Sequence, residues 1–308
     1  MASAIKDAQS RIKEILLQDI ENNGNFRSFY GTLLGAPLMK DIVKDALCSG
    51  KRLRPSIIGS MSHYTNHHFM LFIEYVHASS LIVDDLPCMD NDTVRRGAPS
   101  IHSKYGEHMA QLTAYNLMIT AMKHFSDGFY LIKSLYCEED NDLLYKLLND
   151  EINTNLGYAG ICGGQALDLL ICTNKELQNI SPREQQELLL RTTKMKTGCL
   201  FSLSFILGWV SGGRQVDAIE DLKEAGYCFG ICYQIIDDLK DIEKDTKKNG
   251  GYNNICKYYT YNEIIQLFID NIQYFSDIMT MYSCWNDTIS ELYQYFIASF
   301  KKYTILTK

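Results

Sequence analysis

The stretch Ser80-Leu81-Ile82-Val83-Asp84-Asp85-Leu86-Pro87-Cys88-Met89-Asp90 joins an apolar run to a dense group of carboxylates. A second stretch, Gln234-Ile235-Ile236-Asp237-Asp238-Leu239-Lys240-Asp241, repeats this arrangement. Carboxylates that are crowded at the end of a buried helix repel one another and lose hydration, and a bound cation offsets that cost. Because Mg²⁺ prefers carboxylate oxygens, the two stretches predict a site for several Mg²⁺ ions that acts on a phosphorylated substrate.

The first cluster contains a proline that sets its geometry. Pro87 disturbs the helix after Asp85, so we expect Asp90 to fold back beside Asp84. His77 lies two turns before Asp84 on the same helix face, and a histidine satisfied in the core is the alternative to a functional one.

The second cluster is predicted to lie on an uninterrupted helix. Asp237 and Asp241 are four residues apart and therefore share a helix face, with Asp238 beside them. A solvated acidic patch is the alternative, because Glu243 and Asp245 follow. The apolar residues before the cluster favour a partly buried site.

The spacing of apolar residues predicts helices along the whole chain. Its 308 residues contain only five Pro and no linker-like segment, so we expect one all-α domain over residues 1–308. Ile5, Ala8, Ile12 and Leu16 form one apolar stripe, and residues 67–83, 198–210 and 217–239 are expected to be long helices, the first two central and buried. Residues 140–156 are amphipathic, with Leu143, Leu144, Leu147 and Leu148 in one stripe, and breaks are expected at 49–50, 87–99, 163–164, 211–213 and 249–251.

Charge and composition exclude several classes of partner. The net charge of −7 gives no global support for binding nucleic acid. No apolar run reaches the roughly 18 residues of a membrane span, and the start lacks a signal peptide's apolar core, so a cytoplasmic protein is expected. The ten Cys have unrelated spacings, which favours reduced thiols over a disulfide framework or a zinc site.

Three short basic groups are candidate anion sites. They are Lys51-Arg52-Leu53-Arg54-Pro55, Arg95-Arg96-Gly97 and Lys196-Thr197. Arg binds phosphate with two parallel hydrogen bonds and Lys binds it as a point charge. Any one group can be ordinary surface charge, but the Arg pair directly follows the first carboxylate cluster and can share a metal-bound phosphate with it.

Five motifs occur in the order found in trans-isoprenyl diphosphate synthases, and the chain resembles that family from about residue 40 to 260. They are residues 50–55, residues 84–96, Gly164-Gln165-Ala166-Leu167-Asp168, Lys196-Thr197 and residues 234–238. The spacing from Asp85 to Asp90 resembles the plant geranylgeranyl and bacterial farnesyl branch, and residues 86–92 look closest to plant-type geranylgeranyl diphosphate synthase. The resemblance implies a single-domain isoprenoid synthase fold, with antiparallel helices around a central catalytic cavity, a homodimer, and three Mg²⁺ ions in each active site.

The resemblance also assigns roles to individual residues. It implies that the metal is held by Asp84, Asp85, Asp90, Asp237 and Asp241. The isopentenyl diphosphate would contact Lys51, Arg54, His77 and Arg96. The allylic diphosphate would contact Arg95, Lys196, Thr197, Gln234 and Lys240 or Lys248. The catalytic set would comprise Asp84, Asp85, Asp90, Lys196, Thr197, Gln234, Asp237 and Asp238, with Gln165 and Asp168 flanking the reacting centre.

Product length is predicted from the helix that ends at Asp84. Ser79 and Ser80 lie about one turn before it and are small, whereas farnesyl-type relatives look aromatic at the position of Ser79. Tyr75 lies further along and could form a deeper floor of the pocket. We therefore expect geranylgeranyl diphosphate as the main product, with farnesyl or longer polyprenyl diphosphates as the alternative.

The sequence departs from the family at Tyr115-Asn116, where Gly-Asp is usual, and at Asn253, where Asp is usual. These departures leave open a non-catalytic regulatory subunit of a heteromeric synthase. A terpene cyclase is a further alternative, but it would need one diphosphate site and not two. The expected partners are isopentenyl diphosphate and the allylic diphosphates dimethylallyl, geranyl and farnesyl diphosphate.

Overall fold

The computed structural model describes the chain except for residues 1–2, 25–38, 48, 250 and 307–308. Within the described part, α-helices dominate and the only strands form one short hairpin. The all-α prediction is therefore confirmed. The chain divides into two compact units, which we call the N-terminal unit (Ser3–Cys137) and the C-terminal unit (Glu138–Lys308). Each unit is described by itself, and the single domain over residues 1–308 stays a prediction.

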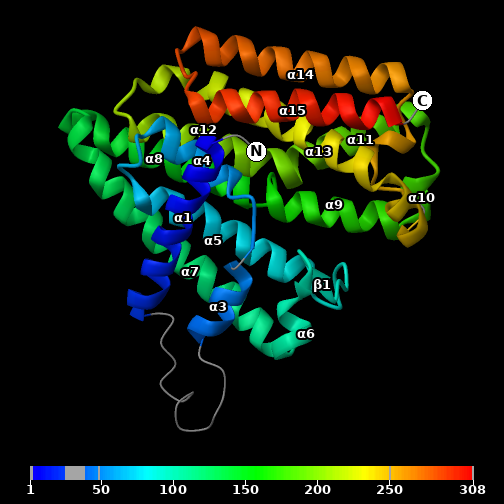
Figure 1. Cartoon of the computed structure of the whole chain (residues 1–308), viewed down its shortest axis with the longest axis horizontal. Helices are drawn as coiled ribbons and strands as arrows, with labels where there is room; N and C mark the ends of the chain where they lie inside the picture. Colours follow the sequence, from blue (N-terminus) through cyan, green and yellow to red (C-terminus); the bar gives the residue numbers. More distant parts are fainter. Residues whose placement is uncertain (1–2, 25–38, 48, 250, 307–308) are drawn as a thin grey trace. The chain divides into compact units, whose positions relative to one another are not determined.

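The elements follow the chain in the colour order of Figure 1. The N-terminal unit contains α1 (Ser3–Asn22), α3 (Met39–Leu47), α4 (Leu53–Met61), α5 (His67–Asp84), β1 (Val94–Arg95), β2 (Ala98–Pro99), α6 (Ile101–Tyr105), α7 (Glu107–Ile132) and the 3₁₀ turn η2 (Lys133–Leu135). The C-terminal unit contains α8 (Glu138–Leu156), α9 (Ile161–Thr173), α10 (Lys175–Gln178), α11 (Pro182–Thr193), the π-helical turn η3 (Lys194–Gly198), α12 (Cys199–Ser211), η4 (Val216–Ala218), α13 (Ile219–Asn249), η5 (Ile255–Lys257), α14 (Tyr261–Met281) and α15 (Asp287–Leu306).

Helices α5 and α7 form the centre of the N-terminal unit, where they lie side by side (Figure 1). Phe125 on α7 packs against Phe69 and Phe72 on α5, with ring centroids 5.9 and 5.7 Å apart. A Cβ atom on Gly128 would lie 2.5 Å from the Phe69 ring, so glycine permits this close approach. The predicted stripe of α1 is buried from Ile5 to Leu16, as the periodicity indicated.

Helix α12 is buried along its whole length in the C-terminal unit and packs against α13. Two glycines on α13 permit close packing, because a Cβ on Gly226 would lie 2.4 Å from Ser202 Cα on α12, and a Cβ on Gly230 would lie 2.5 Å from Gly198 Cα at the end of η3. Phe229 on α13 stacks on Phe296 of α15 at a centroid distance of 4.4 Å. These contacts hold α13, which carries the second aspartate cluster, against the core of its unit.

Two expectations from the sequence are wrong. The predicted break at Gly163-Gly164 lies inside α9, and the turn precedes it at residues 157–160. Both glycines are needed for close packing, since a Cβ on Gly164 would lie 2.5 Å from the Lys196 amide nitrogen. The predicted stripe of α8 is narrower than expected, because Leu144 and Leu148 are buried while Leu143 is 69% exposed.

One segment is apolar enough to be tested as a membrane span. Residues Glu138–Thr173 contain an 18-residue window with a mean hydropathy of 1.2, and a third of that window is buried. The turn at residues 157–160 divides the segment into α8 and α9. The 13 residues of α9 are fewer than the roughly 20 that a spanning helix needs.

Candidate functional site

The first aspartate cluster begins where α5 ends. Asp84 is the last helical residue, and the Asp90 amide donates a hydrogen bond to the Asp84 carbonyl oxygen over 2.9 Å. The prediction that the chain folds back after Pro87 is therefore confirmed for the backbone. Asp84 and Asp90 are both half-buried, and the backbone hydrogen bond brings the two residues side by side in the N-terminal unit.

Asp85 differs from its two neighbours, because its carboxylate is buried and paired with Arg95. Arg95 Nε donates to Asp85 Oδ1 over 2.8 Å, and Arg95 Nη2 donates to the same oxygen. Burial opposes ionisation of the guanidinium, but the hydrogen bonds and charge of Asp85 outweigh it and raise the pKa of Arg95. The pair thus fixes the Arg95 side chain beside the first cluster.

A hairpin turn places Arg96 in a different direction from Arg95. Strands β1 and β2 pair Val94 with Pro99 and Arg95 with Ala98, which leaves Arg96 and Gly97 as the two turn residues. Both have positive φ, 54° and 80°, as a type I′ turn requires. A positive φ is unusual and strained for Arg, and this backbone conformation sets the direction of the Arg96 side chain.

Arg96 meets Arg54 at the imidazole of His77. Arg54 Nη1 and Arg96 Nη2 each lie 3.4 Å from His77 Nε2. Burial, and then the guanidinium charges of Arg54 and Arg96, lower the pKa of His77 well below its usual value. The imidazole is therefore neutral at pH 7, and its Nε2 can accept hydrogen bonds. Three of the four residues predicted for isopentenyl diphosphate come together here.

The other two basic residues of this segment, Arg52 and Lys51, differ in burial. Arg52 is buried, forms an ion pair with Glu74 and donates to the Leu47 carbonyl, so it supports the fold. Lys51 is exposed, and its carbonyl oxygen accepts a hydrogen bond from Gln9 Nε2 over 2.6 Å. Gly50 leaves room for the guanidinium groups, since a Cβ there would lie 2.6 Å from Arg96 Nη1.

The second cluster lies on α13, as predicted. Asp237 and Asp241 share a face and are 42% and 33% exposed, and Lys240 Nζ lies 3.8 and 3.4 Å from their carboxylate oxygens. Two part-exposed carboxylates one turn apart form a donor set that suits Mg²⁺. The ammonium group of Lys240 offsets their repulsion in the metal-free protein.

Asp238 points into the protein and joins a hydrogen-bond chain. Its Oδ1 accepts from Gln234 Nε2 over 2.7 Å, and its Oδ2 accepts from the Ile255 amide over 2.8 Å. Gln234 Oε1 in turn accepts from Thr197 Oγ1 over 2.9 Å. Burial raises the pKa of Asp238 to about 7. Asp238 therefore orients Gln234 and Thr197 and anchors the segment after α13.

Lys196 lies on the π-helical turn η3, between α11 and α12. Its Nζ donates to Asp168 Oδ2 over 2.6 Å, and Asn253 Nδ2 donates to Asp168 Oδ1 over 3.2 Å. An Asp at position 253 would place a carboxylate against Asp168, so Asn suits this arrangement.

Gln165 lies on α9, the helix that also carries Asp168, and its Nε2 and Oε1 are buried without a hydrogen-bond partner among the described residues. An unsatisfied buried amide is costly and marks a position where a ligand can bind.

The residues predicted to set product length lie in the core around α5. Ser79 is buried and its hydroxyl donates to the Ala114 carbonyl on α7 over 2.8 Å, while Ser80 donates to the His77 carbonyl over 2.9 Å. Tyr75 is fully buried, and its hydroxyl donates to Asp19 Oδ2 over 2.6 Å. These contacts hold each side chain in one direction, and a role in product length stays a prediction.

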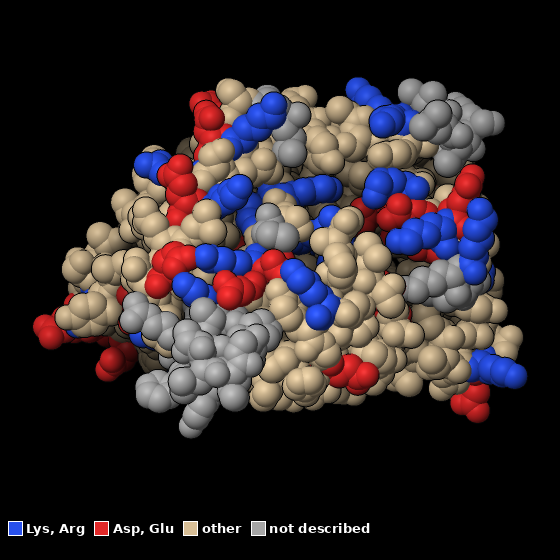
Figure 2. Space-filling model, turned by 60° about the horizontal axis from the view of Figure 1, so that its bottom comes forward, with Lys and Arg blue, Asp and Glu red and all other residues tan. Residues whose placement is uncertain are grey.

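Lys248 and the departures at Tyr115 and Asn116 lie outside the contacts described above. The side chain of Lys248 lies outside the described residues. Tyr115 is 63% exposed on α7, and Asn116 accepts a 3.5 Å hydrogen bond from Thr120. The first cluster belongs to the N-terminal unit and the second to the C-terminal unit, so their convergence on one cavity stays a prediction. On the face drawn in Figure 2, basic and acidic side chains are intermixed.

Two features of this site were not predicted from the sequence. The family resemblance placed Asp85 among the metal ligands and Asp238 in the catalytic set, and it did not predict that both carboxylates are buried and hydrogen-bonded within the protein. An adjacent pair of aspartates on a helix must point about 100° apart, and that spacing was the available signal. Asn254, which donates to the Asp238 carbonyl and to Asp245, gave no signal in the sequence.

Comparison with known proteins identifies the family. The profile of the Polyprenyl synthetase family matches residues 36–254, so the chain belongs to this family. The heterodimeric geranylgeranyl pyrophosphate synthase large subunit 1, chloroplastic, of Arabidopsis thaliana is 30% identical over 72% of the chain and 59% of its own length. Geranylgeranyl pyrophosphate synthase 12, chloroplastic, of the same plant is 30% identical over 72% of the chain and 61% of its length. The chain thus spans about 60% of the length of these relatives.

Solved structures have the same fold. The geranyltransferase of Helicobacter pylori 26695 is 23% identical and superimposes with a TM-score of 0.70, covering 96% of this chain and 99% of its own. The complex of the Helicobacter pylori enzyme with magnesium and isoprenyl diphosphate gives a TM-score of 0.69 at 22% identity, with 98% and 99% covered. At these identities the likeness establishes the isoprenoid synthase fold.

Proposed function

We propose that the protein condenses isopentenyl diphosphate with allylic diphosphates to form longer prenyl diphosphates. The observation that carries this proposal is the presence of two distinct cationic groups in the N-terminal unit. Arg95 lies against the carboxylates of the first cluster, whereas Arg54 and Arg96 meet at His77. Two anion sites suit two diphosphate substrates, and a terpene cyclase with one diphosphate substrate would need only the first.

The carboxylates fit Mg²⁺ by their chemistry. Asp84 and Asp90 supply hard oxygen donors in the N-terminal unit, and Asp237 and Asp241 supply them in the C-terminal unit. When bound, Mg²⁺ neutralises the charge of the diphosphate leaving group. We propose that both pairs serve the same allylic diphosphate and that three ions bind. Asp85 orients Arg95 toward this diphosphate and is not itself the main metal ligand.

The other residues act on the substrates directly. Arg95 and Lys196 hold the allylic diphosphate, with Lys196 positioned by Asp168. Arg54, Arg96 and His77 hold the isopentenyl diphosphate, and the neutral imidazole adds a polar contact without repelling the two guanidinium groups. The reaction also requires that water be kept from the reacting centre, because water would quench an allylic cation. The departing diphosphate takes the proton that the condensation releases, so no side-chain nucleophile is required.

We propose geranylgeranyl diphosphate as the main product, with farnesyl or longer products as the alternative. The two Arabidopsis thaliana relatives described above, both named as geranylgeranyl pyrophosphate synthases, support this choice. Ser79 is small where an aromatic side chain would shorten the pocket.

A homodimer is also proposed, because α7 exposes a stripe of large apolar side chains that includes Leu112, Tyr115 and Ile119. A cytoplasmic location stays a prediction.

The purified chain tests the proposal when it is incubated with labelled isopentenyl diphosphate, Mg²⁺ and each allylic starter. Elongated diphosphates are expected, with the twenty-carbon product dominant, and their rate of formation at a fixed Mg²⁺ concentration should fall strongly in Asp84→Asn and Asp237→Asn. The exposed Asp142→Asn on α8 is the matched control and should retain full activity. Conversion of an allylic diphosphate to hydrocarbon without isopentenyl diphosphate would indicate a cyclase instead. No product from the folded chain alone would indicate a subunit that needs a catalytic partner.

A further inference from the structure

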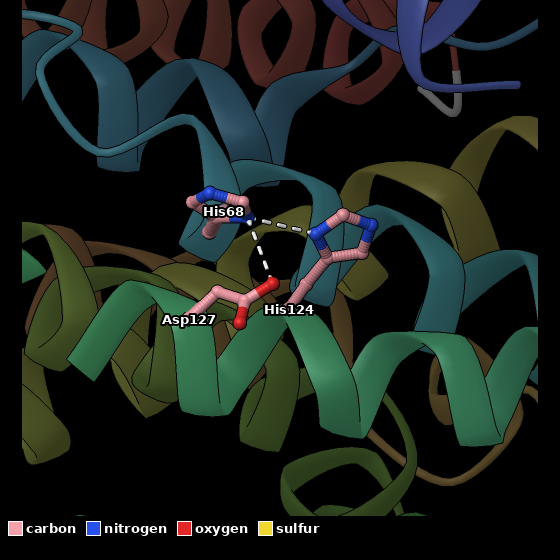
Figure 3. A group of neighbouring side chains, drawn as sticks. All are labelled: His68, His124 and Asp127. Atoms are coloured by element: carbon pink, nitrogen blue, oxygen red, sulfur yellow. Dashed lines mark hydrogen bonds and ion pairs between the residues drawn. The ribbon is translucent and has the colours of Figure 1, made fainter. Parts of the chain in front are cut away.

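A cluster of two histidines and one aspartate lies in the N-terminal unit, apart from the residues assigned to prenyl transfer. His68 is in the first turn of α5, and His124 and Asp127 are one turn apart on α7. Figure 3 shows their side chains converging between the two helices. One ligand atom from each lies within 4.8 Å of the others. Nothing in the proposed prenyl transfer uses these residues.

We propose that His68, His124 and Asp127 form a binding site for Zn²⁺ or a similar late first-row divalent metal ion. Their donor atoms are His68 Nδ1, His124 Nδ1 and Asp127 Oδ2. The two nitrogens are 2.9 Å apart, and His68 Nδ1 is 3.8 Å from the aspartate oxygen. Tetrahedral zinc with bonds of ~2.0–2.1 Å separates its donors by about 3.3 Å, which lies between these distances. The donor atoms of His124 and Asp127 lie within 4.8 Å of one another, so side-chain rotations can bring all three donors to one ion.

The partner of His124 directs its lone pair toward the proposed ion. His124 Nε2 lies 3.2 Å from Asp19 Oδ2, and Tyr75 donates a hydrogen bond to the same oxygen over 2.6 Å. Burial opposes ionisation of Asp19, but its bonds from His124 and Tyr75 lower its pKa, so the carboxylate only accepts hydrogen bonds. His124 must then carry its proton on Nε2, which leaves Nδ1 as an acceptor. A carboxylate that orients a metal-binding histidine in this way is usual at zinc sites.

His68 is equally suited to bind a metal. Burial, and then the neighbouring His124, lower the pKa of His68, so it is neutral at pH 7. In the metal-free protein His68 Nδ1–H can donate to His124 Nδ1. A metal ion takes the place of that proton, and the second His68 nitrogen receives a proton from solvent.

The scaffold around the cluster is fixed before any metal binds. The Asn66 side chain caps α5 by accepting a hydrogen bond from the Phe69 amide, and its Nδ2 donates to the Gly128 carbonyl on α7 over 3.0 Å. These bonds hold the start of α5 against α7 at the position of the cluster. The side chains of His68 and Asp127 are each 34% exposed, so water or another ligand can occupy the fourth coordination position.

The donor set distinguishes this site from the aspartate clusters. Two imidazole nitrogens favour zinc over magnesium, which prefers oxygen ligands only. One cation competes for the site, since Lys123 forms an ion pair with Asp127 Oδ2. Lys123 is 59% exposed, and such a surface pair is weak enough for a divalent ion to displace.

Zinc titration of the metal-free full chain tests the proposal. Calorimetry with ZnCl₂, in excess Mg²⁺ and a non-thiol reductant, should show one site that is lost or weakened at least tenfold in His68→Gln and in Asp127→Asn. Asp19→Asn should weaken binding by about 10–100-fold through His124. Lys123→Met should strengthen it. The adjacent, exposed His67→Gln is the matched control and should bind as wild type does.

A cobalt spectrum separates this site from the cysteines. The nine cysteines in the described part of the chain are all free thiols, and a metal bound by them would show near-ultraviolet thiolate charge transfer. At the proposed site Co²⁺ should show only visible d–d bands, which disappear in His68→Gln while circular dichroism shows intact helices. Unchanged zinc affinity in His68→Gln, thiolate bands on bound cobalt, or no binding by the wild-type chain would each overturn the proposal. The result does not depend on prenyl transfer.

Discussion

The pairing of Asp85 with Arg95 leads to a quantitative prediction about how the first aspartate cluster works. Asp85 receives two hydrogen bonds from Arg95, and the side chains are 4% and 33% exposed respectively. Hydrogen bonds to a charged group contribute ~1.5–3 kcal/mol. Because solvent screens the exposed side of Arg95, we take the lower end, and a coupling of ~1.5 kcal/mol is about tenfold in kcat/KM.

A double-mutant cycle measures this coupling. We would compare kcat/KM for the allylic diphosphate in wild type, Asp85→Asn, Arg95→Gln and the double variant, with the other substrate and Mg²⁺ saturating. The fold-loss of kcat/KM in the double variant should be about ten times smaller than the product of the fold-losses in the two single variants. The Mg²⁺ concentration for half-maximal activity should rise in Asp84→Asn and change little in Asp85→Asn.

Asp92 provides an internal control for the cycle. Its Oδ2 lies 3.5 Å from Arg95 Nη2, and both side chains are about one-third exposed. The Asp92–Arg95 coupling should therefore be ~0.5 kcal/mol or less, about twofold. The reasoning would be refuted if the losses of kcat/KM in Asp85→Asn and Arg95→Gln multiplied independently and the Mg²⁺ requirement of Asp85→Asn matched that of Asp84→Asn. Asp85 would then be a direct metal ligand.

Three further substitutions test other parts of the site. Ser79→Tyr should shift the main product from twenty to fifteen carbons in product chromatography, and an unchanged product length would contradict the proposed pocket wall. Gly50→Ala should raise KM for isopentenyl diphosphate several-fold and leave KM for the allylic substrate unchanged, because its Cβ would displace the Arg96 guanidinium. Asn253→Asp should lower the melting temperature in metal-free buffer, since a carboxylate would then face Asp168; an equal or higher value would show that this contact does not govern residue 253.

The residues of the proposed zinc site could not be grouped from the sequence. His68 and His124 are 56 residues apart, and Asp19 is a further 49 residues before His68. No local spacing joins them, because the turn-by-turn contacts of a helix extend only three or four residues. They meet because α5 and α7 pack closely at Phe69 and Gly128.

The sequence alone determined the helical class, the extents of the buried helices and the position of both aspartate clusters. Apolar periodicity and the effect of Pro87 act over a few residues, so local physics was sufficient for these features. Packing decided what the sequence could not: which aspartate of each pair turns inward, why Gly164 lies inside a helix, and how Arg54 and Arg96 meet at His77. These depend on close approaches between segments distant in sequence, where a single Cβ or carboxylate changes which side chains can fit.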